Sequence, residues 1–182
     1  MKGNFPACLA FTIGPSAFGP LGEEGGWSDN PADPGGATQR GITIGTYRGW
    51  CARNGLPTPS VDDLRLMPDS QRTVIYHDGY WRTVAGDALP LGIDLMLFDF
   101  GVDAGPGRSA EILQRAVGVA EDGAIGPVTL AAISALDARE VIARLAVGQI
   151  NHYRADPDFG TFGNGWIART ERRRMAALAM VP

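Results

Sequence analysis

The stretch that decides the fold runs from Glu23 to Thr43 and reads Glu-Glu-Gly-Gly-Trp-Ser-Asp-Asn-Pro-Ala-Asp-Pro-Gly-Gly-Ala-Thr-Gln-Arg-Gly-Ile-Thr. Proline removes a backbone donor and glycine admits positive φ, so no helix or long strand can continue through it. Two carboxylates, Glu24 and Asp33, lie in this stretch, and Thr38 follows them. Turn-forming residues beside carboxylates and an aromatic ring indicate a shaped loop rather than a linker. We therefore expect the rest of the chain to hold this loop in place.

The composition is that of a globular protein. A chain of 182 residues with 45% hydrophobic residues fits one domain, or two small ones that share a core. The net charge of -4 disfavours a general nucleic-acid binder. Cys8 and Cys51 are too few for a disulfide scaffold, and two free thiols are favoured over a bond between them. The short apolar run 5–13 contains Pro6, and we expect neither an export signal nor a membrane span.

Helical patterns surround the loop. Capping residues and prolines predict helix starts at Thr43, Ser60, Pro68, Pro90 and Pro127. The helix that follows Pro90, residues 91–102, is apolar nearly all round and is predicted to be central and buried. Other helices are predicted over residues 7–13, 109–117, 141–153 and 164–179. No tract alternates at period two over a useful length, so at most a small hairpin is expected within residues 25–45.

Two carboxylates in unlike surroundings are what glycoside hydrolysis requires. Glu24, close to Trp27, can be partly desolvated, which raises its pKa toward that of a general acid. Asp33 on a polar turn stays ionised more easily and can activate water, which the Thr38 hydroxyl could hold. Alternatively, Glu24 caps a helix and the aspartates are ordinary turn residues. The residue types alone leave both interpretations open.

Other chemistries fit the sequence less well. Residues 29–35 lack the spacing and the closing glutamate of a calcium loop. His77 and His152 lie far apart without a zinc-type pattern around them. No nucleophile elbow and no nucleotide-binding glycine motif occurs, and Cys51 is interpreted as a core residue rather than a nucleophile.

Residues 24–38 closely resemble the signature E-G-G-[YW]-x-[ND]-x-P-x-D-P-G-G-x-T of the glycoside hydrolase family 108 lysozymes, which are N-acetylmuramidases found among phage endolysins and prophage genes. The resemblance implies a mainly α, lysozyme-like helical globule with a small irregular or β-hairpin region that carries the catalytic motif. It implies cleavage of the β-1,4 bond between N-acetylmuramic acid and N-acetylglucosamine, with Glu24 as the general acid. Asp33 and Thr38 nearly match the spacing of the water-activating residues in phage-type lysozymes. No cofactor and no metal is implied.

Further residues look like that family. They are Tyr76, Tyr80 and Trp81, and the segment 97–102, which includes Asp99. Sugar contacts are predicted for an aromatic set and one carboxylate: Trp27, Tyr47, Tyr80, Trp81 and Asp99. For the rings the alternative is core packing, and for Trp81 it is the favoured one.

The second half resembles a peptidoglycan-binding module. Leu113–Val119, Asp122-Gly123 and Gly126-Pro127-x-Thr129 are similar to a pattern of murein-binding domains, and Gly165-Trp166 with Arg169 is similar to the family's closing G-W-x-x-R. We expect a catalytic region over residues 1–95 and a peptidoglycan-binding-like helical region over residues 96–182, packed as one globule.

Two departures from the family pattern stand out. Residues 14–22 form a Gly- and Pro-rich insertion before Glu24, and Asp103 occupies a position where the family commonly has asparagine. The insertion keeps a second hypothesis open, a non-catalytic murein-binding protein with an inactivated cleft. A third hypothesis is a lytic transglycosylase, which forms 1,6-anhydro ends.

Peptidoglycan is the expected partner, without nucleic acid or a stable membrane anchor. The protein is expected to be made in the bacterial cytoplasm and to act in the periplasm or cell wall after release through a phage holin. A terminal run of arginines, Arg169 and residues 172–174, is interpreted as a solvated helix face partly paired with Glu171, in preference to a contact with wall polymers or a membrane.

Overall fold

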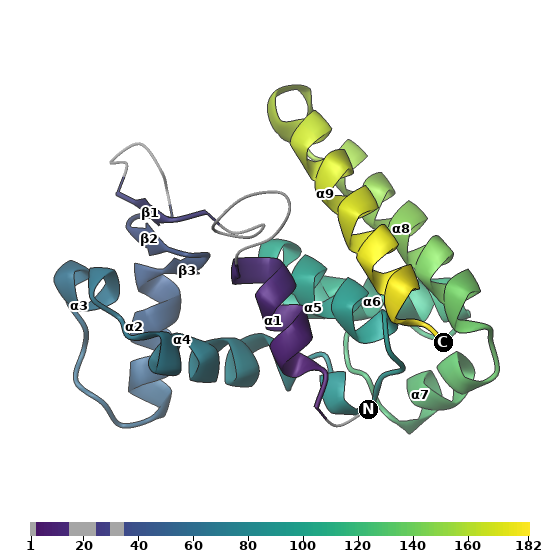
Figure 1. The fold of residues 1–182 in the computed structure, drawn as a ribbon, viewed down its shortest axis with the longest axis horizontal. Coiled ribbons are helices and arrows are strands. Elements are labelled where there is room, and N and C mark those ends of the chain that lie inside the picture. Colours follow the sequence, from purple (N-terminus) through teal and green to yellow (C-terminus); the bar gives the residue numbers. More distant parts are fainter. Residues whose placement is uncertain (1–2, 15–24, 30–34) are drawn as a thin grey trace. The chain divides into compact units, whose positions relative to one another are not determined.

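A computed structural model describes residues 3–14, 25–29 and 35–182 of the chain. The chain divides into two compact units, which we name by their content (Figure 1). The sheet unit is Leu9–Gly79, and the helical unit combines Met1–Cys8 with Tyr80–Pro182. The helix α1 (Phe5–Ile13) and the π-helix η1 (His77–Trp81) each continue across a boundary between the units.

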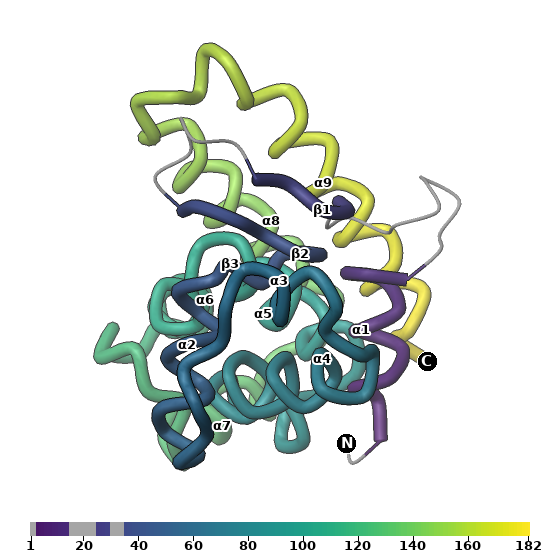
Figure 2. Tube along the Cα trace, turned by 90° about the vertical axis from the view of Figure 1, so that its left-hand side faces the viewer, coloured from purple at the N-terminus to yellow at the C-terminus, as the bar shows by residue number. Residues whose placement is uncertain are grey.

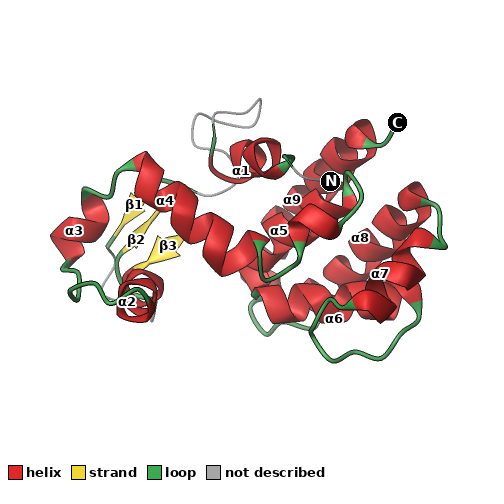
Figure 3. Cartoon of the chain, turned by 90° about the horizontal axis from the view of Figure 1, so that it is seen from below, coloured by secondary structure: helices red, strands yellow, loops and turns green. Residues whose placement is uncertain are grey.

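The sheet unit contains a small antiparallel sheet with strand order β1-β2-β3 (Figure 3). Its strands are β1 (Trp27–Ser28), β2 (Thr38–Gln39) and β3 (Ile42–Thr43). Arg40 and Gly41 both have positive φ and make the tight turn from β2 to β3. The sequence predicted at most a hairpin here, and the structure adds one more short strand to it.

Three helices complete the sheet unit: α2 (Ile44–Arg53), α3 (Val61–Arg65) and α4 (Asp69–Tyr76). Two of their predicted starts are confirmed by side-chain caps. The Thr43 hydroxyl accepts the backbone N–H of Thr46, and Ser60 forms a reciprocal capping box with Asp63. Pro68 was predicted to be the first residue of α4 but is its N-cap, so this helix starts one residue later.

The helical unit contains η2 (Gly86–Ala88), α5 (Ile93–Ala104), α6 (Pro106–Val117), α7 (Pro127–Ser134), α8 (Ala138–Arg154) and α9 (Phe159–Met180). Every residue of α5 from Ile93 to Gly101 is buried, which confirms the predicted central helix. The two longest helices, α8 and α9, lie side by side (Figures 1 and 2). Because α5 is buried, the polar side chains that it carries need partners inside the helical unit.

Five further helix starts differ from the prediction, among them those of α1, at Phe5 rather than residue 7, and α8, at Ala138 rather than residue 141. The helix α5 begins at Ile93 rather than two residues earlier, because Gly92 at its N-cap has a φ of 84°. A Cβ on Gly92 would lie 2.4 Å from the carbonyl oxygen of Ala177, so close packing against α9 fixes this glycine. The helix α6 already begins at Pro106, and α9 begins at Phe159. The predicted starts for these two helices, residues 109 and 164, were too late.

Both cysteines are buried and free, as predicted. Burial raises the pKa of the Cys8 thiol, and the nearby Asp94 and Asp99 raise it further. A thiol that stays protonated is a poor nucleophile, so Cys8 is a core residue of the helical unit.

Candidate active site

The predicted site residues fall into three groups. Glu24 and Asp33, with most of the insertion predicted over residues 14–22, lie outside the described residues. Thr38, Trp27 and Tyr47 belong to the sheet unit. The remaining three, Tyr80, Trp81 and Asp99, belong to the helical unit.

The strand register brings together the two ends of the glycine- and proline-rich motif. Ser28 on β1 pairs with Thr38 on β2, which in turn pairs with Thr43 on β3. Residues paired across neighbouring strands project from the same face of a sheet, so one face of this sheet carries a row of three hydroxyl side chains. The Thr38 hydroxyl donates a hydrogen bond of 3.2 Å to the carbonyl of Gly36 and keeps its oxygen lone pairs as acceptors.

Trp27 lies on the other face of the sheet, paired with Gln39. The guanidinium carbon of Arg65 lies 5.5 Å from the centre of the Trp27 ring, which is a cation–π contact. The Gln39 side chain donates to the carbonyl of Arg65 at 3.3 Å. Trp27 is partly buried, so its ring keeps some surface for a sugar while Arg65 orients it.

Tyr76 supports the turn between β2 and β3, a role that the sequence did not reveal. Its hydroxyl donates to the carbonyl of Arg40 at 2.6 Å, and the backbone N–H of Arg40 donates to the carbonyl of Gly26 at 3.1 Å. Tyr76 is fully buried on α4. Arg40 has a positive φ, and both its carbonyl and its N–H are held by hydrogen bonds. The sheet that carries Thr38 is thus fixed to α4. In the sequence, Tyr76 was noticed only because it resembles the family pattern, and this gave no indication of its role at the turn.

Tyr47 is a core residue of the sheet unit. Its side chain lies on α2 and is only 6% exposed. Burial raises the pKa of its hydroxyl, and the neighbouring Cys51 adds to the effect. Its surroundings support core packing, the alternative to a sugar contact.

Trp81 is also a core residue. Its ring is 0% exposed and packs against Phe5 and Phe98 at centroid distances of 5.5 and 5.7 Å. A Cβ on Gly86 would lie 2.4 Å from the indole, so the chain passes close over the ring. Nothing in this environment supports the predicted sugar contact of Trp81. Tyr80, beside it in η1, is partly buried, and its predicted sugar contact stays a prediction.

Asp99 holds two arginines in the centre of the helical unit. Arg169 donates to both carboxylate oxygens at 3.1 and 2.9 Å, and Arg173 donates at 2.6 Å. Burial alone would raise the pKa of Asp99, but the two guanidinium groups outweigh it and hold this pKa far below its usual range. Arg173 also donates to Gln149 at 2.7 Å. Asp99 is thus a fully buried counter-ion, which leaves it no surface for a sugar.

The predicted solvated arginine face is wrong for two of its members. Arg169 and Arg173 are buried, because they are one helical turn apart and both point to Asp99. Arg174 does form the expected surface pair with Glu171. The closing motif is therefore structural. Trp166, three residues before Arg169, stacks on Tyr153 at a centroid distance of 5.1 Å.

Asp103, the position that departs from the family pattern, has a partner in α8. It accepts a hydrogen bond from the Tyr153 hydroxyl. Burial raises the pKa of that hydroxyl, and Asp103 raises it further, whereas Arg173 lowers it. The additional negative charge is thus placed where a buried phenol can donate to it.

The murein-binding pattern of the second half also has a structural explanation. The Gln114 side chain donates to Asp122 at 2.6 Å and to the carbonyl of Ala124 at 3.1 Å, and it accepts the N–H of Gly123 at 2.9 Å. Its amide also lies 3.4 Å from the Thr129 hydroxyl on α7. The glutamine, the Asp-Gly turn and the threonine of the pattern are one hydrogen-bonded unit that fixes the loop between α6 and α7.

The described residues do not carry two other kinds of feature. No helix within them is long and apolar enough to cross a membrane. Among the same residues, histidines, cysteines and carboxylates do not gather into a group that could hold a metal ion.

Comparisons with known proteins divide the chain into two parts. Residues 20–105 match the model of the family described as glycosyl hydrolase 108, and residues 108–171 match that of a predicted peptidoglycan domain. The structure of SagA from Brucella abortus is 37% identical, with a TM-score of 0.86 over 99% of this chain and 97% of that one. No curated protein matches the chain. The first family model ends at residue 105 and the second begins at residue 108, whereas the sheet unit ends at Gly79. The expected boundary at residue 95 stays a prediction.

Proposed function

Because the chain belongs to the glycosyl hydrolase 108 family, we propose that it is an N-acetylmuramidase, which hydrolyses the β-1,4 bond between N-acetylmuramic acid and N-acetylglucosamine. The peptidoglycan domain over residues 108–171 supports peptidoglycan as the substrate. Peptidoglycan lies outside the cytoplasmic membrane, so the enzyme acts in the periplasm or the cell wall.

The proposed mechanism uses three residues of the motif. Glu24 protonates the glycosidic oxygen as the bond breaks, and Asp33 removes a proton from a water molecule that attacks the opposite face of the sugar. The Thr38 hydroxyl accepts a hydrogen bond from this water while it donates to Gly36. Attack from the opposite face inverts the anomeric carbon.

The observation that carries the proposal is the pairing of Ser28 with Thr38. The motif leaves the sheet after β1 and returns to it at β2, so Ser28 at the end of β1 and Thr38 at the end of the motif are neighbours on one face. Asp33 belongs to the connection between these strands, and Glu24 immediately precedes Gly25. A threonine fixed beside both ends of the motif is suitably placed to position a water for a carboxylate that the motif carries.

The decisive experiment is Glu24→Gln, with the release of reducing ends from purified peptidoglycan as the measurement. Glutamine keeps the size of the side chain but cannot donate the carboxylic proton. Loss of a general acid lowers the rate by about 10²–10⁴-fold. Glu23→Gln is the matched control, because it removes the same charge one position earlier. This control should keep nearly full activity.

Three results would contradict the proposal. A loss smaller than about tenfold in Glu24→Gln would remove this residue from the role of acid. Binding to sacculi without any release of reducing ends by the natural protein would favour a non-catalytic binder. Products with 1,6-anhydro ends, identified by mass spectrometry of the muropeptides, would identify a lytic transglycosylase.

A further inference from the structure

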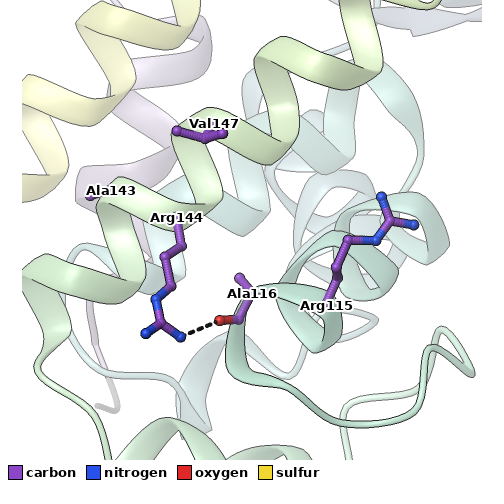
Figure 4. Close-up of a pocket in the computed structure, with 5 residues that line it drawn as sticks. All are labelled: Arg115, Ala116, Ala143, Arg144 and Val147. Carbon is purple, nitrogen blue, oxygen red and sulfur yellow. Dashed lines mark hydrogen bonds between the residues drawn. The ribbon is translucent and has the colours of Figure 1, made fainter.

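A groove between α6 and α8 lies in the helical unit, away from the core that Asp99 organises. Its larger hollow has a volume of about 480 Å³ and is lined by Arg115, Ala116, Ala143, Arg144 and Val147 (Figure 4). A second hollow of about 210 Å³ continues along the same two helices and shares Arg115 with the first. We call these two hollows together the α6–α8 groove.

Small residues shape the groove. A Cβ on Gly148 would lie 2.6 Å from a methyl carbon of Ile112, so the glycine allows α8 to pack closely on α6 there. Ala116 and Ala143 leave the adjacent space open, and most of the surface that lines the larger hollow is apolar. Val147 borders this hollow and is 59% exposed, so its methyl groups are accessible to a bound molecule.

Cationic side chains surround this apolar floor. Arg144 donates to the carbonyl of Ala116 at 2.9 Å and pairs with Glu140 across one helical turn (Figure 4). Arg115 forms a bidentate salt bridge with Glu121. Both are surface pairs, with both partners at least one third exposed, and such pairs exchange readily for another carboxylate. The glutamates themselves do not line either hollow.

We propose that the α6–α8 groove binds the acidic stem peptide of peptidoglycan, with arginines on the peptide carboxylates and the apolar floor under its alanine methyl groups. Arginine matches the planar geometry of a carboxylate. In peptidoglycan the glycan sugars are largely uncharged, and the carboxylates lie on the peptides. The groove also lies within the residues that match a peptidoglycan domain. This proposal rests on the proposed function for the identity of the substrate and adds which part of it is recognised.

The test measures binding of a soluble stem peptide by calorimetry with the natural protein, since the peptide contains no glycosidic bond that the enzyme could cleave. The double variant Arg115→Ala/Arg144→Ala should weaken binding by about tenfold or more, because it removes both charge-assisted contacts. Arg174→Ala is the matched control, since it also breaks a surface pair of arginine and glutamate but lies on α9 outside the groove. The control should bind like its parent.

A second pair of variants tests the apolar floor without removing an arginine. Val147→Asp places a negative charge in the groove and should weaken peptide binding, whereas Val128→Asp makes the same change at a 72% exposed site on α7 and should not. Circular dichroism of each variant verifies that the helices are retained. Unchanged peptide binding in both groove variants would overturn the proposal.

Sedimentation with sacculi separates the peptide from the glycan. In the Glu24→Gln background, the groove variants should lose binding to intact sacculi relative to their controls, and in calorimetry they should match their controls on soluble N-acetylglucosamine oligosaccharides, which carry neither peptide nor carboxylate. Equal losses on both materials would indicate glycan recognition and overturn the proposal. Because the stem peptide contains no glycosidic bond, a failure of Glu24→Gln to lose activity would contradict the proposed function and leave the calorimetric result unaffected.

Discussion

The two units use polar side chains in opposite ways. In the helical unit, Asp99 is completely buried and its carboxylate forms ion pairs with Arg169 and Arg173. In the sheet unit, Thr38 is partly buried and its hydroxyl donates one hydrogen bond to the carbonyl of Gly36. A carboxylate with two guanidinium partners cannot exchange a proton near neutral pH, whereas a hydroxyl with unused lone pairs can still hold a water.

The difference separates residues that specify the fold from residues that are free for chemistry. The Asp99 network joins α5, α8 and α9 and includes Gln149, whose amide donates to the carbonyl of Met96 at 2.9 Å. Two hydroxyls of the row on the sheet form local hydrogen bonds, Thr38 with Gly36 and Thr43 with the N–H of Thr46 that it caps. Removing a partner should therefore affect stability in the helical unit and activity in the sheet unit.

The largest expected effect comes from Asp99→Ala. It would leave Arg169 and Arg173 buried without a counter-ion, and breaking a buried pair in this way costs about 3–5 kcal/mol of unfolding free energy. Urea unfolding followed by circular dichroism measures this loss. The control is Glu140→Ala, which breaks the exposed pair with Arg144 and should cost at most about 1 kcal/mol. Equal losses in the two variants would show that the buried network does not hold the helical unit together.

Thr38→Val makes the opposite test in the sheet unit. Valine keeps the shape of the side chain and the strand preference, so stability should change little. Without the hydroxyl the attacking water loses its support, and turnover should fall on the order of ten- to a hundredfold. Thr38→Ser is the control, because it restores the hydroxyl and should recover most of the activity. A loss of stability in Thr38→Val without a change in turnover would assign Thr38 to the fold.

Much of the architecture follows from local signals in the sequence. The caps at Thr43 and Ser60 mark helix starts correctly because their hydroxyls accept N–H groups of the first turn. Pro127 marks one because it has no N–H that would need a partner there and its φ suits a first helical residue. The mainly helical, lysozyme-like fold class with a small β region is confirmed on this basis. The start of α5 was misplaced because Gly92 is fixed by the carbonyl of Ala177, a contact between positions far apart in the sequence.

Contacts between positions far apart in the sequence also decide the roles of the buried arginines. Arg169 and Arg173 form their ion pairs with a carboxylate more than sixty positions away, and local patterns cannot show this. One sequence signal did exist, because Asp99 lies in the middle of a helix that is otherwise almost entirely apolar. Glu24 and Asp33 are proposed from the motif and its family, since they lie outside the described residues.

The acid dependence of stability tests the charge state of Asp99. Its pKa is lowered in the folded protein, so its contribution to stability is present above the unfolded pKa of about 3.9 and is lost as the pH falls below it. One such carboxyl changes the unfolding free energy by about 1.4 kcal/mol per pH unit in this window. Burial raises the pKa of Asp94, which contributes with the opposite sign.

Asp94 is present in both the natural protein and Asp99→Asn. The difference between their unfolding free energies therefore isolates the contribution of Asp99. Asparagine is neutral at every pH, so the stability gap between the two proteins should be largest near neutral pH and shrink below pH of about 4. Thermal unfolding at a series of pH values measures the gap. A gap that stays constant down to strongly acidic pH would mean that folding does not change the pKa of Asp99.

The smallest expected effect, Thr43→Ala, asks whether the sheet unit is stabilised locally. The variant removes the cap of α2, where the Thr43 hydroxyl accepts the N–H of Thr46 at 3.1 Å, and should cost about 1 kcal/mol. Thr43→Ser keeps an oxygen at the same place and should cost much less.

Hydrogen exchange locates the loss of stability in Thr43→Ala. Faster exchange in α2 with unchanged exchange in α5 is expected, because the cap acts only on the first turn of its own helix, whereas Asp99→Ala should speed exchange in α5 and α9 together. If Thr43→Ala also exposed the amides of α5, local caps and the buried ion network would stabilise a single cooperative structure, and the contrast between the units would not hold for stability.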